Sequence, residues 1–115
     1  MIENALITNV SLNFKDHGVL TLNIVLEGSG WGCCFGGYVL GIGYLGAKEF
    51  KGEEKGIECI MRIMDVIGVD DLMLAKGKYI RVELSGWGGS IIKIGNIIHD
   101  KWFSYSDVYK EEISE

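Results

Sequence analysis

The residue types that favour ligand binding concentrate in one glycine-rich stretch, residues 28–46. Eight of its nineteen residues are glycine, and Trp31 and Phe35 stand among them. Glycine lets the backbone adopt positive φ and approach a ligand closely, at a cost in chain entropy that a purely structural segment avoids. The stretch therefore predicts a binding surface rather than a core element. Gly36 and Gly37 indicate a bulge or a close approach by another group.

A second set of aromatic, amide and cationic residues lies at expected strand ends in the C-terminal half. The flat rings of Trp87 and Trp102 can stack on a purine. Asn96 can bond an adenine edge at two points, and Arg81 or Lys101 can meet phosphates. Each residue also has a structural interpretation, because tryptophans often anchor cores or interfaces and a strand asparagine is often bonded within the fold.

The chain has two arginines, Arg62 and Arg81, for any planar two-point grip on a phosphate. Arg62 shares a polar helical stripe with Glu58, which is typical of a solvated helix face. Arg81 lies on an expected strand face beside Tyr79 and Glu83. That mixed aromatic and charged surface suits a binding site or an interface.

The polar residues do not form a recognised catalytic motif. His17 in an expected turn and His99 at an expected strand end belong to no nucleophile motif, and the adjacent Cys33 and Cys34 carry no family signature. Residues 41–46 match the pattern GxGxxG, but a hairpin precedes them where a dinucleotide fold needs a parallel strand. We therefore expect no catalysis, although backbone N–H groups of such a loop can bind an anion.

The length and composition of the chain limit its number of domains, its partners and its cellular compartment. At 115 residues the chain fits one domain, 1–115, and its net charge of −5 argues against nucleic-acid polymers and anionic membranes as partners. Three cysteines with an adjacent pair fit neither a disulfide framework nor metal-binding CxxC spacing, which favours a reducing cytosol and no metal. The sequence shows no signal-peptide pattern and no apolar run of ~20 residues, so we expect a soluble intracellular protein.

Hydrophobic periodicity predicts where the secondary structure lies. Residues 6–14 and 20–26 alternate in polarity around a short turn and predict an antiparallel hairpin, with Leu6 on the same face as Val10. Residues 33–40 predict a weaker third strand, and 78–84 and 91–98 predict two more. A helix is expected over residues 53–67, with an apolar face formed by Ile57, Ile60, Met61, Met64 and Ile67.

These elements predict an α+β fold, a mostly antiparallel sheet of about five strands with one main helix packed on a face. The tetrapeptide Ser-Gly-Trp-Gly occurs twice, at 29–32 and 85–88, each time where one expected strand gives way to the next. No longer register accompanies it, so a duplicated domain is not expected.

Four ordered blocks of sequence carry a family resemblance. They are WGxxFGGYxL at 31–40, ExIMRI at 58–63, GKYIRV at 77–82 and IGNIIxDKWF at 94–103. In this combination the chain resembles the first-described class of Thoeris anti-defence proteins, which phages encode. The resemblance covers roughly residues 6–103, nearly the whole domain.

The resemblance implies a non-enzymatic sponge that works in the cytoplasm of the bacterial host. Proteins of that family sequester the glycocyclic ADP-ribose signal made by bacterial TIR-domain enzymes and hold it intact, with no cofactor. They assemble as dimers or hexamers with pockets between protomers, and some members hold cyclic oligonucleotides in separate pockets. A binder of a scarce signal needs an affinity near ~ −12 kcal/mol, and a small domain reaches it more readily with a pocket between copies.

The predicted ligand contacts, taken from motif position and side-chain chemistry, divide into four roles. Trp31, Phe35 and Trp102 are expected to stack on or enclose the ligand, and Gly36 and Gly37 to allow close approach of the backbone. Asn96 is expected to recognise the base, and Arg81 and Lys101 to bind the phosphates. Arg62 and His99 complete the set. Two other classes stay open: a protein-binding inhibitor of another host defence system, similar to an anti-CRISPR protein, and a cysteine-dependent enzyme.

Overall fold

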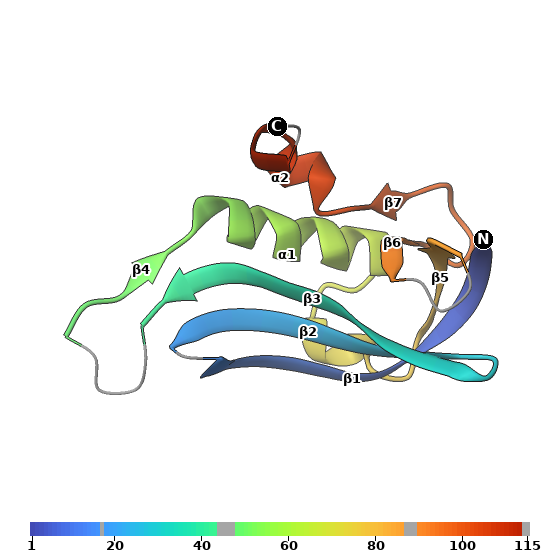
Figure 1. Ribbon diagram of the computed structural model, residues 1–115. Helices are drawn as coiled ribbons and strands as arrows, with labels where there is room; N and C mark the ends of the chain where they lie inside the picture. Colours follow the sequence, from blue (N-terminus) through green and yellow to red (C-terminus); the bar gives the residue numbers. More distant parts are fainter. Residues whose placement is uncertain (17, 44–47, 87–89, 114–115) are drawn as a thin grey trace.

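The computed structural model describes residues 1–16, 18–43, 48–86 and 90–113, so His17 and Trp87 lie outside the described residues. One antiparallel sheet dominates it, with the strand order β4-β3-β2-β1-β5-β6-β7 (Figure 1). The strands are β1 (Ile2–Asp16), β2 (Val19–Gly28), β3 (Trp31–Ile42), β4 (Lys51–Gly52), β5 (Tyr79–Leu84), β6 (Ile91–Gly95) and β7 (Trp102–Phe103).

The α+β class, the antiparallel sheet and the single main helix on one face are confirmed. The predicted number of strands was too small, because the described residues form a sheet of seven strands rather than about five. The difference is β4 and β7, which contain two residues each and lie at the two edges of the sheet. Two residues do not complete a period of alternation, so the polarity pattern could not indicate these strands.

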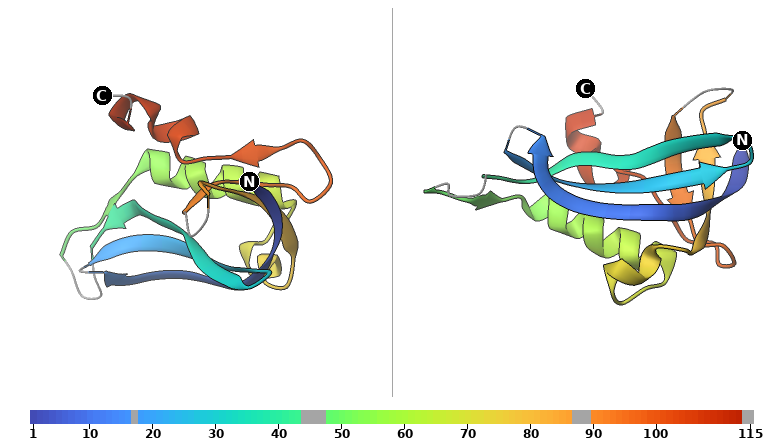
Figure 2. Two further views of the ribbon diagram at one scale, coloured as in Figure 1. Left: turned by 45° about the vertical axis from the view of Figure 1, so that its right-hand side comes forward. Right: turned by 90° about the horizontal axis from the view of Figure 1, so that it is seen from below.

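The long strand β1 organises the sheet. Its first part pairs with β5 and the rest pairs with β2, so one strand joins the N-terminal hairpin to the C-terminal strands. The sheet curls around α1 (Glu54–Ile67), and Figure 2 shows the helix lying in the hollow. The curl also brings β3 and β6 close to each other, although they are not neighbours in the strand order.

The hairpin of β1 and β2 is confirmed, with one correction. A bulge between Ile7 and Asn9 shifts the register, so Ala5 and Ile7 point into the core and are almost fully buried. Leu6 therefore lies on the opposite face from Val10, which packs against the core. A bulge inserts one residue and exchanges the two faces of a strand, which simple alternation cannot anticipate.

Helix α1 forms where expected and ends at Gly68, which adopts the left-handed conformation at φ +88°. Its predicted apolar face was wrong at Ile57 and Met61, which are 52% and 66% exposed, whereas Ile67 is buried and Ile60 and Met64 pack against the core as predicted. The residues that face the sheet are Gly56, Cys59, Ile63, Val66 and Ile67. Two of these, Gly56 and Cys59, are small and contribute little to a hydropathy pattern, so the pattern placed the buried face too near the larger side chains.

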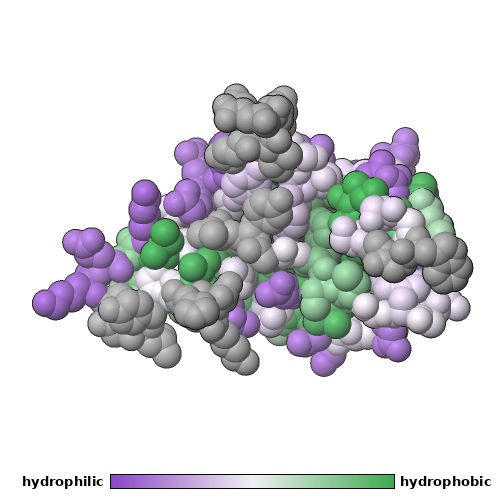
Figure 3. Space-filling view, viewed as in Figure 1, coloured by the Kyte–Doolittle hydropathy of each residue, from purple (hydrophilic) through white to green (hydrophobic). Residues whose placement is uncertain are grey.

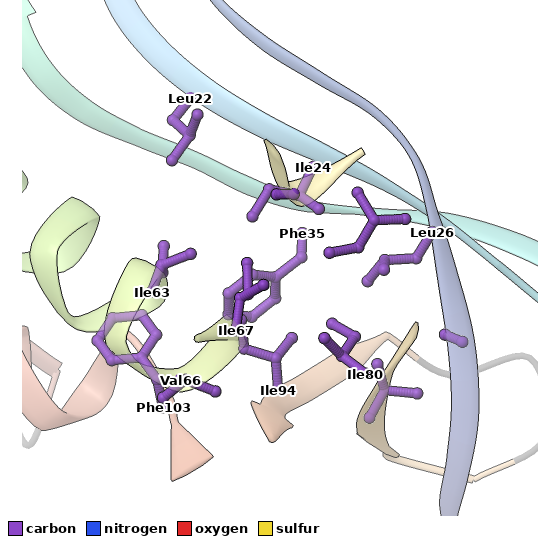
Figure 4. Packing of buried hydrophobic residues seen from close by; sticks show 14 of the residues in the cluster. Leu22, Ile24, Leu26, Phe35, Ile63, Val66, Ile67, Ile80, Ile94 and Phe103 are labelled. Atoms are coloured by element: carbon purple, nitrogen blue, oxygen red, sulfur yellow. The ribbon is translucent and has the colours of Figure 1, made fainter. Parts of the chain in front are cut away.

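The core lies between the hollow of the sheet and α1. In Figure 4, Ile63, Val66 and Ile67 of the helix point toward strand residues including Ile24 and Ile94. The ring of Phe35 packs against Phe103 and Tyr105, with centroids 6.3 and 5.0 Å away. This aromatic cluster ties the middle of β3 to the end of β7.

Two short helices complete the fold. A 3₁₀ helix, η1 (Leu72–Ala75), leads from α1 to β5, and its first turn is capped by Asp71, whose side chain accepts a hydrogen bond from the Met73 amide. A C-terminal helix, α2 (Ser106–Ile113), follows β7. Among the described residues, no helix is long and apolar enough to cross a membrane.

Candidate functional site

The connection between β6 and β7 is shaped by the side chain of Asn96. Its amide oxygen accepts hydrogen bonds from the backbone N–H groups of Ile98 and His99, at 2.9 and 2.8 Å. Its amide nitrogen donates to the Val66 carbonyl at the end of α1, at 2.8 Å. The predicted strand over 91–98 stops at Gly95 because these local bonds turn the chain.

Arg81 fixes the same connection from β5. Its Nε donates to the Asn96 carbonyl at 2.7 Å, and its Nη2 donates to the His99 carbonyl at 2.8 Å. Arginine carries five N–H donors, so the guanidinium keeps further donors for another acceptor. The described partners of Arg81 are carbonyl dipoles and an aromatic ring, which orient its positive charge without cancelling it.

Trp102 lies across β6 beside Arg81. The register places Arg81, Gly95 and Trp102 in one row across three strands. Gly95 is required there, because a Cβ atom on it would stand 2.5 Å from Cε3 of the Trp102 ring. The Arg81 guanidinium lies 4.6 Å from the ring centroid and the Lys93 ammonium 4.7 Å, so two cations meet one indole.

Carboxylates stand at the border of this surface. Lys93 is 3.9 Å from Glu83, and the Trp102 indole N–H donates to Asp100 at 2.9 Å. Partly exposed pairs of this kind contribute little to stability and exchange partners readily. We call Arg81, Lys93 and Trp102 the cationic indole surface. Sequence reasoning missed Lys93, although its position two residues before Gly95 places it on the same strand face.

Lys101 and His99 lie in the connection next to this surface. Lys101 pairs with Asp65 of α1 at 3.1 Å, and both side chains are largely exposed. Lys101 also lines a cavity of about 500 Å³ between the end of α1, η1 and Lys78. The structure thus brings together five predicted residues at one end of the sheet: Arg81, Asn96, His99, Lys101 and Trp102.

Trp31 lies apart from these residues, at the turn between β2 and β3. Its ring covers Gly28, its direct partner across the ladder, and its indole N–H donates to Glu3 at 2.9 Å. An open cavity of about 420 Å³ beside it is lined by Thr8 and Glu27, among others. Its surroundings are therefore acidic, whereas those of Trp102 are cationic.

The other predicted contacts lie in β3 and α1, away from the cationic indole surface. Phe35 is 4% exposed and belongs to the aromatic cluster of the core. Gly36, at φ +148°, closely approaches β2, because a Cβ atom there would overlap the Leu22 carbonyl oxygen. Gly37 follows it in β3. Arg62 bonds Glu58 at 2.7 Å on the solvent side of α1, and no described contact joins it to Arg81.

A smaller cavity of about 300 Å³ opens between β3 and the C-terminal strands. We call it the slot, and three segments line it: residues 34–36, 90–92 and 104–106. Figure 3 shows hydrophobic residues gathered on this face where β3 passes β6. Ser90, Ser104 and Ser106 were not among the predicted site residues, since single serines carry no motif.

The cysteines are unpaired thiols in different environments. Cys34 is exposed and lines the slot, whereas Cys59 is buried on the sheet-facing side of α1. Burial raises the pKa of the Cys59 thiol to about 11, and the neighbouring Glu58 charge adds to the increase. Within the described ranges, no group of three or more His, Cys, Asp or Glu residues could hold a metal ion.

Comparison with known proteins gives no relative for this chain. No family model matches it, and neither a curated protein nor a solved structure does.

Proposed function

We propose that this protein binds and sequesters a cyclic ADP-ribose isomer of the glycocyclic type, made by TIR-domain enzymes. It holds the signal intact and so blocks Thoeris immune signalling, as a phage anti-defence protein in the bacterial cytoplasm. The observation that carries this proposal is the cationic indole surface, where two cations lie 4.6 and 4.7 Å from the centroid of one indole ring, next to a turn held by Arg81.

The geometry suits a phosphorylated ligand. Arg81 is held by two carbonyls, so its free donors are oriented before a ligand arrives and little side-chain entropy remains to be lost. A diphosphate bound there accepts charge-assisted hydrogen bonds from Arg81 and draws Lys93 away from its long contact with Glu83. The amide of Asn96 is already bonded within the turn, so in this proposal Asn96 shapes the site instead of reading the base.

A second copy of the chain completes the pocket in this proposal. The cationic indole surface lies on an open sheet face, and sequestration at nanomolar concentration needs more enclosure than an open face provides. The exposed Ile57 and Met61 on α1 offer apolar contact area for such a dimer or hexamer. The net charge of −5 disfavours nucleic-acid polymers as competing ligands.

The test uses the purified protein and the signal produced by a TIR-domain enzyme. Protein and signal are mixed and filtered, the retained protein is heated, and the released compound is identified by mass spectrometry. The proposal expects retention and release of unaltered signal. Altered product would indicate an enzyme, and signal that passes the filter freely would exclude the proposal.

The two arginines provide a matched pair of variants. Arg81→Ala is expected to weaken retention about 10- to 100-fold, because charge-assisted bonds to phosphate are lost. Arg62→Ala removes the same charge from a solvated helix face and is expected to leave retention within about twofold. Because Arg81→Ala also releases the turn, Lys93→Ala serves as a second variant on the same surface, and melting curves check that each variant folds.

A protein-binding inhibitor of another defence system is the second candidate. The observation that favours it is exposed apolar area on the helices, at Ile57 and Met61 of α1 and at Met73 and Leu74 of η1. This candidate expects a host protein that co-purifies with the wild type and is lost with Met61→Lys. It also expects no thermal shift with nucleotides, which separates it from the first.

A further inference from the structure

The slot exposes the backbone edge of a strand. β4 pairs only with Gly41 and Ile42 of β3, so in the described part of the chain no strand pairs with residues 34–36 on that side. The slot of about 300 Å³ lies along this edge and faces residues 90–92 and 104–106. Backbone N–H and C=O groups on an unpaired edge are ready to bond an extended or planar partner.

The described residues that line the slot are uncharged. Its apolar wall comes from Ile91, Ile92 and the paired rings of Phe35 and Tyr105, which lie 5.0 Å apart at 31°. Its polar groups are hydroxyls, of which Ser104 and Ser106 lie 3.0 Å apart. This combination favours a neutral planar ring with hydrogen-bonding edges and disfavours a phosphate, since none of the lining side chains is a cation.

The slot adjoins the cationic indole surface along two strands. Lys93 directly follows Ile92 in β6, and Trp102 precedes Ser104 by two residues at the end of β7. Two residues of extended chain span ~7 Å, which is comparable to the reach from a nucleoside to its phosphates. A neutral pocket and a cationic surface at this spacing match the two halves of a nucleotide.

We propose that the slot takes the nucleoside end of the ligand, with the base edge against the backbone of residues 34–36 and the ribose hydroxyls near Ser104 and Ser106. The phosphates then extend over Lys93 toward Arg81. The phosphate part of this inference rests on the proposed function, whereas recognition of the nucleoside does not. At about 300 Å³, the slot accommodates one nucleoside and leaves the rest of a dinucleotide outside.

Cys34 provides a reporter inside the slot. The variant Cys33→Ser keeps Cys34 as the exposed thiol, while Cys59 is buried with a raised pKa and reacts slowly at pH 8. The rate of Cys34 alkylation by iodoacetamide is measured by mass spectrometry, alone and with adenosine, cyclic ADP-ribose or inorganic diphosphate. Adenosine and cyclic ADP-ribose are expected to slow alkylation at least about fivefold, and diphosphate is expected to leave the rate unchanged.

A matched pair of bulky substitutions checks the location. Ile92→Trp fills the slot from a residue that is 44% exposed and should abolish protection by adenosine, whereas Met73→Trp, at a residue 72% exposed on η1, should preserve it. Melting curves verify both folds.

Full protection of Cys34 by adenosine in Ile92→Trp, or unprotected Cys34 at saturating adenosine, overturns the inference. If the signal is retained on the filter without protecting Cys34, the slot is wrong and the proposed function stands. If adenosine protects Cys34 but the signal is not retained on the filter, the slot binds a nucleoside and the proposed function is wrong.

Discussion

Trp31 and Trp102 use the same local arrangement on opposite faces of the sheet. Each indole lies on a glycine directly across the ladder, Gly28 and Gly95 respectively. Trp31 is four residues before the buried Phe35 in β3, so both side chains lie on the core face of the sheet. Trp102 directly precedes the buried Phe103 in β7, so its side chain lies on the outer face. Large rings that cover strand glycines restore packing that glycine lacks, so this arrangement alone is structural.

The two tryptophans differ in their charged neighbours. Trp31 bonds Glu3 and borders a cavity that includes Glu27, whereas Trp102 meets Arg81 and Lys93. An anionic ligand is repelled by the first environment and attracted by the second. The comparison therefore indicates that Trp102 belongs to a binding surface because cations surround it. The pairing of a tryptophan with a glycine does not distinguish it from Trp31, which only packs.

The largest expected difference is in the free energy of unfolding, when the β6–β7 connection before Trp102 and the β2–β3 turn before Trp31 are each altered by one substitution. Asn96→Ala should lower the free energy of unfolding by about 3 kcal/mol, because it leaves the Val66 carbonyl and two backbone amides without partners. Gly30→Ala in the short turn before Trp31 should cost only about 1 kcal/mol, from strain at φ +78° in otherwise open space. Urea unfolding measures both changes. Equal losses would mean that Asn96 is not the organiser of its connection.

The sequence predicted the parts of this comparison unequally. Trp31 and the glycines around it were visible as a local cluster, and the hairpin and α1 were visible because each follows a regular hydrophobic period. The structural role of Asn96 was not visible, since its partner Val66 lies 30 residues away. Lys93 was missed for a different reason, because its contact with Trp102 depends on how the two-residue strand β7 pairs with β6. The slot arises only from the curl of the sheet, which brings β3 and β6 together.

Removing each indole tests which one contacts the ligand. Trp102→Leu should weaken retention of cyclic ADP-ribose about 10- to 100-fold, since stacking on an aromatic side chain contributes ~1–3 kcal/mol per base or ring. Trp31→Leu should leave retention within about threefold, although both variants should lose stability through the uncovered glycine. The filter assay gives the affinities, and unfolding curves separate binding from folding. A larger loss of retention from Trp31→Leu would place the ligand at the acidic end instead.

The smallest expected effect comes from the charges themselves. Lys93→Gln keeps the length of the side chain but removes one cation near Trp102, and it should weaken retention about two- to fivefold at low salt, because a single partly exposed charge contributes little. Glu27→Gln removes an exposed carboxylate near Trp31 and should change retention less, since its charge acts only at a distance. Raising the salt concentration should shrink the Lys93→Gln effect, because mobile ions screen the lost attraction. If the effect of Lys93→Gln does not depend on salt, Lys93 acts by packing on the indole and not through its charge. Arg81 alone would then account for the difference in charge between the surroundings of the two tryptophans.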